Sequence, residues 1–189
     1  MAVGCELVAR IEYSTLPVPA FLEHTVMIAA GAVSFGVEYR HLDEATILAA
    51  YGPDARAKFG GVRPAGIGAV VEEDGLSLHV FETASGDERL RFDCFDDAPH
   101  YHLLSPAQSR NVVVEHDPSA GPLLDWALRR LATSLGPMLG EAGADDLARR
   151  LDAPVVEAAV RTTGGVARYV VAAGRPVLTV PSAARVSDS

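Results

Sequence analysis

Cysteine is scarce in this sequence, and its scarcity excludes two classes of protein. Only Cys5 and Cys94 occur in 189 residues, so the fold cannot depend on a disulfide framework or on a cysteine-rich zinc site. A chain of this length buries about 70% of the surface that its unfolded form exposes, which is enough for one core without such crosslinks. We therefore expect residues 1–180 to form a single domain, followed by a small, polar, disordered tail at 181–189.

Lysine is scarcer still, because Lys58 stands alone beside fifteen arginines, and the net charge is −9. Nucleic-acid backbones are bound by clustered cations, whereas the basic residues here are scattered or lie beside acids. The composition therefore argues against a nucleic-acid partner and against a large polyanionic substrate. A small molecule or a protein stays open as the partner.

Long apolar runs and targeting signals are also missing. The most apolar stretch, residues 25–37, has about half the length that a membrane-spanning helix requires, and the first residues do not have the pattern of a signal peptide. We expect a cytoplasmic protein with no membrane partner. The mean hydropathy of +0.17 fits a homodimer that buries apolar surface between two copies, although a dense core accounts for it equally well.

Sequence motifs that identify a reaction are absent. There is no Walker loop, no HExxH and no CxxC. Residues 66–68 contain a glycine pair with no helix expected after it, and residues 31–36 have one residue too many before the serine for a nucleophile elbow. Function has to be inferred from smaller constellations of side chains.

What the sequence does contain is an order of elements in which strands come first and helices last. Apolar residues alternate in segments 76–82 and 89–95, which flank a turn at 84–87 and predict the clearest hairpin of the chain. The same reasoning predicts further strands and one short helix. The strands are expected at 6–13, 25–30, 33–41, 100–104 and 111–116, and the helix, capped by Asp43, at 45–51.

Helical periodicity marks the C-terminal third. Leucines spaced at i, i+4 between Leu123 and Leu131 give one apolar stripe, and two short helices are expected at 145–151 and 154–160. The pair Gly164-Gly165 is expected to end the last of them, and residues 167–172 to form a final strand. This order predicts an α+β fold, with a mainly antiparallel sheet of about six to seven strands in the N-terminal two-thirds and the C-terminal helices packed against it.

One segment concentrates titratable side chains, since Asp93 to His102 holds three carboxylates and two imidazoles within ten residues. Strand side chains alternate between faces, so His100 and His102 project from the same face. Asp93 shares that face if the intervening turn preserves it. Two imidazoles and a nearby carboxylate are a common starting set for zinc, iron or manganese. The structural alternative is an exposed acidic turn followed by an edge strand.

His116 offers a third imidazole. If segment 111–116 pairs antiparallel with segment 100–104, His116 lies at the far end of its strand, close to His100. A metal would then be held by His100, His102 and His116. The sequence does not determine the register, and a histidine hydrogen-bonded at the start of a helix is the structural alternative.

The other titratable residues are expected to have structural roles. Glu38 and Arg40 share one face of a strand and are expected to pair. His24 and His79 are isolated in the sequence and are expected to be structural or solvated. Cys94 alternates with core residues and is expected to behave as a small buried hydrophobe.

Two functions from different classes remain open. One is a small enzyme with a site at Asp93, Asp97, His100, His102 and His116. It would act through a divalent metal and its bound water, or through one histidine as general base oriented by an aspartate. The other is a non-catalytic, self-associating binding or interaction domain whose polar turn contacts a partner. The metal content of the purified protein distinguishes the two.

Overall fold

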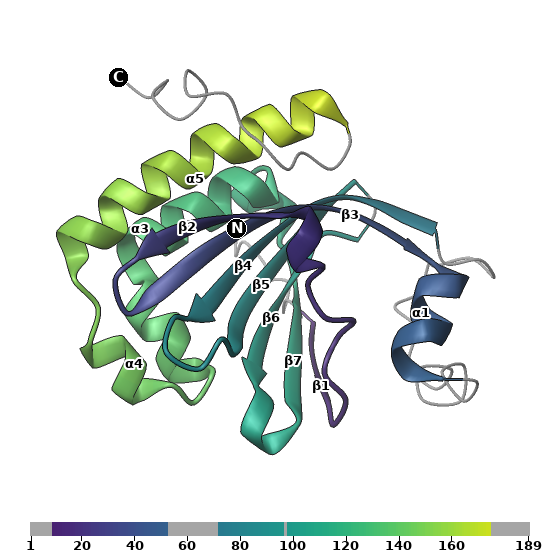
Figure 1. The fold of residues 1–189 in the computed structure, drawn as a ribbon, viewed down its shortest axis with the longest axis horizontal. Coiled ribbons are helices and arrows are strands. Elements are labelled where there is room, and N and C mark those ends of the chain that lie inside the picture. Colours follow the sequence, from purple (N-terminus) through teal and green to yellow (C-terminus); the bar gives the residue numbers. More distant parts are fainter. Residues whose placement is uncertain (1–8, 53–71, 97, 175–189) are drawn as a thin grey trace, which may run out of the picture.

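The computed structural model describes residues 9–52, 72–96 and 98–174, and a seven-stranded sheet lies at its centre. All neighbouring strands are antiparallel, in the order β1-β7-β6-β5-β4-β3-β2. Helices α3 and α5 pack against one face of the sheet (Figure 1). The strands are β1 (Arg10–Tyr13), β2 (Thr25–Ala30), β3 (Val33–Asp43), β4 (Glu72–Glu82), β5 (Glu88–Phe95), β6 (His100–Ser105) and β7 (Arg110–Glu115).

The helices follow the sheet in the chain, apart from α1, which connects β3 to the segment before β4. This arrangement confirms the predicted α+β fold with an antiparallel sheet and C-terminal helices. None of the described helices has the length and apolar character that crossing a bilayer requires. The helical elements are α1 (Glu44–Tyr51), α3 (Leu123–Glu141), α4 (Asp145–Arg149) and α5 (Ala153–Ala173), with short 3-10 turns η1 (Leu22–His24), η2 (Pro106–Gln108) and η3 (Pro118–Ala120).

The hydrophobic core lies between the sheet and the helices α3 and α5. Phe35, Leu78, Phe92 and Leu103, from four successive strands, are each at most 1% exposed. Every second residue of these strands points to the helices, as the alternation in the sequence predicts. Full burial of one such side chain contributes about 1.5–3 kcal/mol.

Helix α5 corrects two expectations from the sequence. The pair Gly164-Gly165 does not end a helix and residues 167–172 do not form a strand, because α5 is continuous across both. A glycine inside a helix costs about 1 kcal/mol, but α5 buries an apolar stripe that includes Val166 and Val170 against the sheet. The helix ends instead at Gly174, whose φ of 58° lies in the left-handed region.

The face of the sheet that points away from α3 and α5, called the polar face below, is lined by charged and polar side chains. Glu38, His79, Arg91 and His102 come from β3, β4, β5 and β6 and are each at most 5% exposed. Residues 14–21, the cover segment, cross this face on the way from β1 to η1. The sequence places these polar residues between core residues of the same strands, so the sheet separates an apolar side from a buried polar side.

Two predicted segments extend beyond the described residues. The first strand was expected from residue 6, and β1 is described only from Arg10. The expected tail at 181–189 lies wholly outside the described residues.

Candidate metal centre on the polar face

Three potential metal ligands meet on the polar face where β5 and β6 pair. Asp93 on β5 is the cross-strand partner of His100 on β6, and His102 lies two residues further along β6. The Nε2 atoms of the two histidines are 3.1 Å apart. Oδ2 of Asp93 is 3.1 Å from Nε2 of His102 and 3.4 Å from Nε2 of His100. Within the part of the chain that the structure describes, these three form the group of ligand atoms close enough to share one ion.

Hydrogen bonds on the far side of each imidazole fix its orientation. Nδ1 of His100 lies 2.8 Å from the carbonyl oxygen of Ala98, and Nδ1 of His102 lies 2.8 Å from Oδ1 of Asn111. Nδ2 of Asn111 donates to the carbonyl of Thr15, which assigns its amide oxygen to His102. Because both partners are acceptors, each Nδ1 carries a hydrogen, and the Nε2 of each ring is directed at Asp93.

The carboxylate of Asp93 is buried and anionic. Burial raises the pKa of this carboxyl, but the hydrogen bond and charge of His102 and the charge of Arg91 outweigh it, so the pKa lies well below its usual range. Ser77 donates to Oδ1 at 2.5 Å, which leaves Oδ2 directed at the imidazoles. For His102, burial is the main cause that lowers the pKa, against the opposing hydrogen bond to Asp93. A neutral imidazole and a carboxylate are the protonation states that a metal requires.

The separations among the three atoms match a metal coordination sphere. With metal–ligand bonds of about 2.0–2.1 Å, neighbouring ligands lie about 3.3–3.4 Å apart in a tetrahedron and about 2.9–3.0 Å apart in an octahedron. The observed separations of 3.1, 3.1 and 3.4 Å fall across this range. Without a cation or a proton between them, two lone pairs and an anionic oxygen would repel one another at these distances.

His116 is not part of this group, although its backbone lies where the sequence predicted. Strands β6 and β7 pair antiparallel with His100 opposite Glu115, and the backbone N–H of His116 donates to Pro99. Since side chains alternate, the residue after Glu115 turns to the other face of the sheet. There the His116 ring lies 5.4 Å from the ring of Trp126, and Nε2 is 2.6 Å from the Gly121 carbonyl. Asp93, and not His116, is the third group beside the two histidines.

Asp97 and Cys94 are the remaining residues of this segment to which the sequence analysis assigned a role. Asp97 lies outside the described residues. Cys94 is partly buried, and burial raises the pKa of its thiol. A thiol of this kind is a weak nucleophile, in agreement with the apolar role expected for it.

A second set of buried charges adjoins the candidate metal centre and was not predicted as a unit. This ionic network consists of Glu38, Arg40, His79, Glu88 and Arg91. The expected pairing of Glu38 with Arg40 is confirmed, with Oε2 and Nη1 at 3.3 Å. His79, expected to be structural or solvated, is buried between two carboxylates, with Nε2 2.9 Å from Glu38 and Nδ1 2.6 Å from Glu88. Arg91 pairs with Glu88 at 2.6 Å.

The electrostatics of the ionic network favour the charged form of His79. Burial lowers the pKa of this imidazole, but the charge and hydrogen bond of Glu88 and the hydrogen bond of Glu38 outweigh burial, so the pKa is raised. In the sequence, the ionic network was indicated only by polar residues that alternate with core residues in β3, β4 and β5. Only the register of the three strands shows that these residues meet.

The cover segment accepts hydrogen bonds from three side chains of the polar face. Arg40 and Arg91 both donate to the carbonyl of Val18, at 3.1 and 2.8 Å. Asn111 donates to the carbonyl of Thr15 at 3.3 Å. Buried charges are costly unless they are hydrogen-bonded, so the cover segment stabilises the network, and through Asn111 it also contacts the candidate metal centre.

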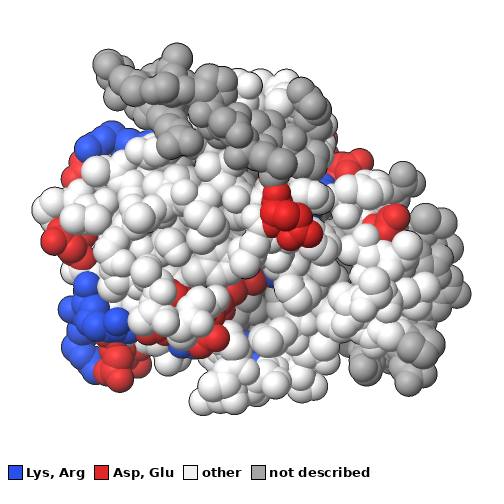
Figure 2. All heavy atoms as spheres, in the orientation of Figure 1, with Lys and Arg blue, Asp and Glu red and all other residues white. Residues whose placement is uncertain are grey.

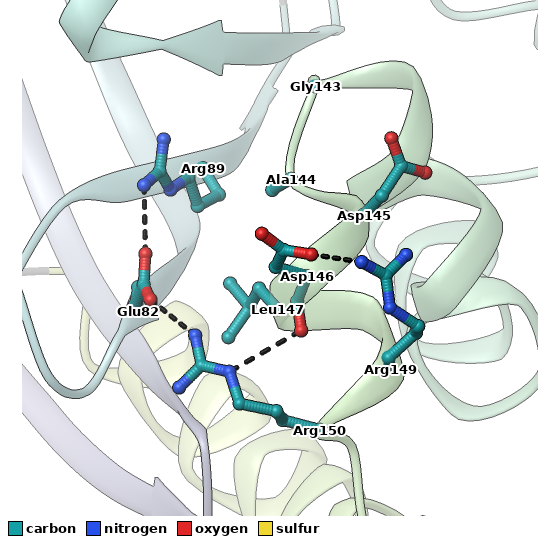
Figure 3. Close-up of a pocket in the computed structure, with 9 residues that line it drawn as sticks. All are labelled: Glu82, Arg89, Gly143, Ala144, Asp145, Asp146, Leu147, Arg149 and Arg150. Carbon is teal, nitrogen blue, oxygen red and sulfur yellow. Dashed lines mark hydrogen bonds and ion pairs between the residues drawn. The ribbon is translucent and has the colours of Figure 1, made fainter.

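A polar hollow of about 650 Å³ lies elsewhere, between the β4–β5 hairpin and α4 (Figure 3). Its charged side chains are paired with one another, since Glu82 accepts from Arg89 at 2.8 Å and from Arg150 at 2.5 Å, and Asp146 pairs with Arg149. Figure 2 shows charges of both signs gathered over α4. These pairs connect the hairpin to α4, and each of the three arginines already has a carboxylate partner.

Comparison with known proteins gives a family and no function. A family model described as a domain of unknown function, DUF7700, matches residues 27–167. That span contains the three candidate ligands and the whole ionic network. No curated protein and no solved structure matches the chain.

Proposed function

We propose that this chain, which belongs to the DUF7700 family, binds a divalent transition-metal ion through Asp93, His100 and His102 and uses it in metal-assisted chemistry. The observation that carries the proposal is the convergence of two Nε2 atoms and one carboxylate oxygen within 3.4 Å of one another. The rings are oriented by Ala98 and Asn111 on their far sides. Such outer partners are a regular feature of histidine metal ligands.

A metal ion accounts for this arrangement more completely than a proton does. Both Nδ1 hydrogens are engaged with oxygen acceptors, so in the neutral state no hydrogen stands between the two Nε2 atoms. One added proton can form a hydrogen bond between only two of the three atoms, whereas one metal ion can be coordinated by all three. General-base catalysis by a histidine oriented by Asp93 is the metal-free alternative, and it requires that added proton.

The ligand types restrict which metals fit. Imidazole nitrogen suits zinc, iron and manganese among others, and the carboxylate favours the harder members of that set. No sulfur ligand belongs to the group, so a site for copper(I) is disfavoured. Zinc, iron(II) and manganese(II) are the ions to test first.

Three protein ligands leave at least one coordination position open, which is typical of catalytic sites and not of structural ones. A bound ion of this kind polarises a substrate oxygen and lowers the pKa of a coordinated water to about 7. A substrate would reach the metal from the side of His100, because the side chain of His100 is 22% exposed, whereas those of Asp93 and His102 are 5% and 6% exposed. We assign the reaction class as metal-assisted hydrolysis or hydration of a small molecule.

Self-association, expected from the mean hydropathy, remains a separate proposal. The three ligands come from one chain, so the metal centre does not require a second copy. The non-catalytic alternative, a binding domain whose polar turn contacts a partner, predicts no stoichiometric metal.

The proposal is tested by metal content and calorimetry. After treatment with chelator and dialysis, the protein is titrated with zinc, manganese and iron(II), and one ion per chain is expected. His100→Ala and His102→Ala should each abolish saturable binding. Asn111→Ala should weaken it about 10–100-fold, because an outer partner of a ligand is lost. His24→Ala, an exposed histidine on η1, is the matched control and should bind as the unaltered chain does.

Circular dichroism on every variant shows whether the fold is kept. Stoichiometric binding that survives the combined His100→Ala and His102→Ala change would falsify the assignment of the ligands. Failure of the unaltered chain to bind any of the three ions would remove the metal centre and leave the general-base and binding-domain alternatives.

A further inference from the structure

The two edges of the sheet differ in charge. Edge strand β1 carries Arg10 and Glu12, which pair with Glu141 and Arg110. Charged side chains on an edge strand are a common device that prevents its pairing with another chain. Edge strand β2 has the sequence TVMIAA and carries no charge. Among the described strands, only β3 pairs with β2, so one row of β2 backbone N–H and C=O groups faces outward.

Apolar side chains are exposed along this unprotected edge. Met27 on β2 is 47% exposed, and Leu22 on the adjoining turn η1 is 63% exposed. Val26 and Ile28 point to the core side and are still only partly buried. The surface over β2 is largely uncharged (Figure 2). An uncharged edge with exposed apolar side chains is a template for a further strand.

The charge of the chain restricts where a second copy could supply that strand. With a net charge of −9, two copies repel each other over most of their surfaces. They can approach where no like charges meet. Antiparallel pairing of two β2 strands about a two-fold axis brings Glu23 and His24 of one copy beside the uncharged turn at Gly31 and Ala32 of the other. A second copy also supplies an uncharged strand of the same length at the same concentration.

We propose that the chain forms a homodimer in which the β2 strands of two copies pair antiparallel, so that one continuous sheet runs through both. The interface is isologous, as a two-fold axis requires. Backbone hydrogen bonds join the two strands, and Leu22 and Met27 are the apolar side chains that become covered. The metal centre lies on β5 and β6, so this inference does not rest on the proposed function.

The oligomeric state of the full chain tests the proposal. Light scattering after size exclusion should give twice the chain mass of 19.9 kDa. Met27→Lys combined with Ala29→Lys places positive charges on the edge of both copies, and like charges then face each other across the two β2 strands. We expect this variant to be a monomer that keeps its fold, because both side chains are exposed in the single chain. Leu48→Lys on α1 is the matched control and should remain a dimer.

Amide hydrogen exchange gives a second readout that identifies the edge. In the unaltered chain the outward amides of β2 should be protected, and they should lose protection in the Met27→Lys, Ala29→Lys variant while β5 and β6 keep theirs. A monomer at all concentrations overturns the proposal. So does a dimer that persists in a folded double variant, since it must use another surface.

Discussion

His79 and His102 lie on the same face of the sheet, one on each side of Arg91, and their pKa values shift in opposite directions. His79, Arg91 and His102 are cross-strand neighbours on β4, β5 and β6. Burial lowers the pKa of both imidazoles, but His79 also lies between Glu88 and Glu38, and these carboxylates reverse the shift. For His102 burial prevails. The carboxylates around His79 therefore favour its cationic form, whereas burial favours the neutral form of His102.

The raised pKa of His79 predicts how stability depends on pH. Its folded pKa exceeds the unfolded value of about 6.5, so its protonation stabilises the fold fully below that value. The contribution is lost as the pH rises through the folded pKa. The difference in unfolding free energy between the unaltered chain and His79→Gln should therefore be largest near pH 6 and should shrink toward pH 9. Each unit of pKa shift corresponds to about 1.4 kcal/mol.

Urea denaturation at a series of pH values, with chelator present, measures this difference. His24→Gln, at an exposed position outside the ionic network, should show no comparable trend. A difference for His79→Gln that grows with rising pH would contradict the cationic role of His79.

At the scale of elements, the packing of β3 against its neighbours depends on a residue without a side chain. Gly36 lies opposite His79 on β4 and opposite Met27 on β2. A Cβ atom at this position would lie 2.8 Å from Cγ2 of Thr25 and 3.0 Å from the ring of Phe81. Sheet side chains close over Gly36 from both neighbouring strands, which is possible only because the position is a glycine.

Gly36→Ala should destabilise the chain by about 1–3 kcal/mol, the usual cost of overpacking. Thr25→Ser removes the nearest methyl group and keeps the hydroxyl that donates to Phe21. The cost of Gly36→Ala should therefore be smaller in the Thr25→Ser background, as measured by a double-mutant cycle in urea. An equal cost in both backgrounds would show that contact with Thr25 is not the cause.

At the scale of the whole molecule, the sheet separates two interiors with different chemistry. On one side α3 and α5 cover an apolar core, and on the other the cover segment lies over buried charges and accepts hydrogen bonds from Arg40 and Arg91. The candidate metal centre belongs to the polar interior, and Asn111 connects it to the cover segment. Metal binding is therefore expected to stabilise the fold as a whole.

Saturation with zinc should raise the melting temperature. A ligand at 100 times its Kd stabilises the folded state by about 2.7 kcal/mol, which is a shift of roughly 5–10 °C for a chain of this size. Scanning calorimetry with zinc and then with excess chelator should show the rise and its reversal. His24→Ala should respond as the unaltered chain does, whereas His100→Ala should not respond. An equal rise in His100→Ala would mean that zinc binds elsewhere.

Local patterns in the sequence determined the fold class, the strands of the sheet apart from the false one at 167–172, and the side of the sheet on which residues lie. Alternation with a period of two depends only on the pleat of a single strand. It therefore placed His100 and His102 on one face, opposite the core residues, and it paired Glu38 with Arg40 before any partner strand was known. The same local information does not contain the register between strands.

Only the tertiary structure decided which of these side chains meet. The pairing of β5 with β6 brought Asp93 to the two histidines, and alternation after Glu115 turned His116 to the other face. His79 became part of an ionic network because β3, β4 and β5 align their polar residues. In α5, the free energy gained by burying apolar side chains against the sheet exceeded the cost of the glycine pair in a helix, and this gain comes from contacts that are not local in the sequence. Such contacts join residues far apart in the chain, so their free energy exists only once the sheet has formed.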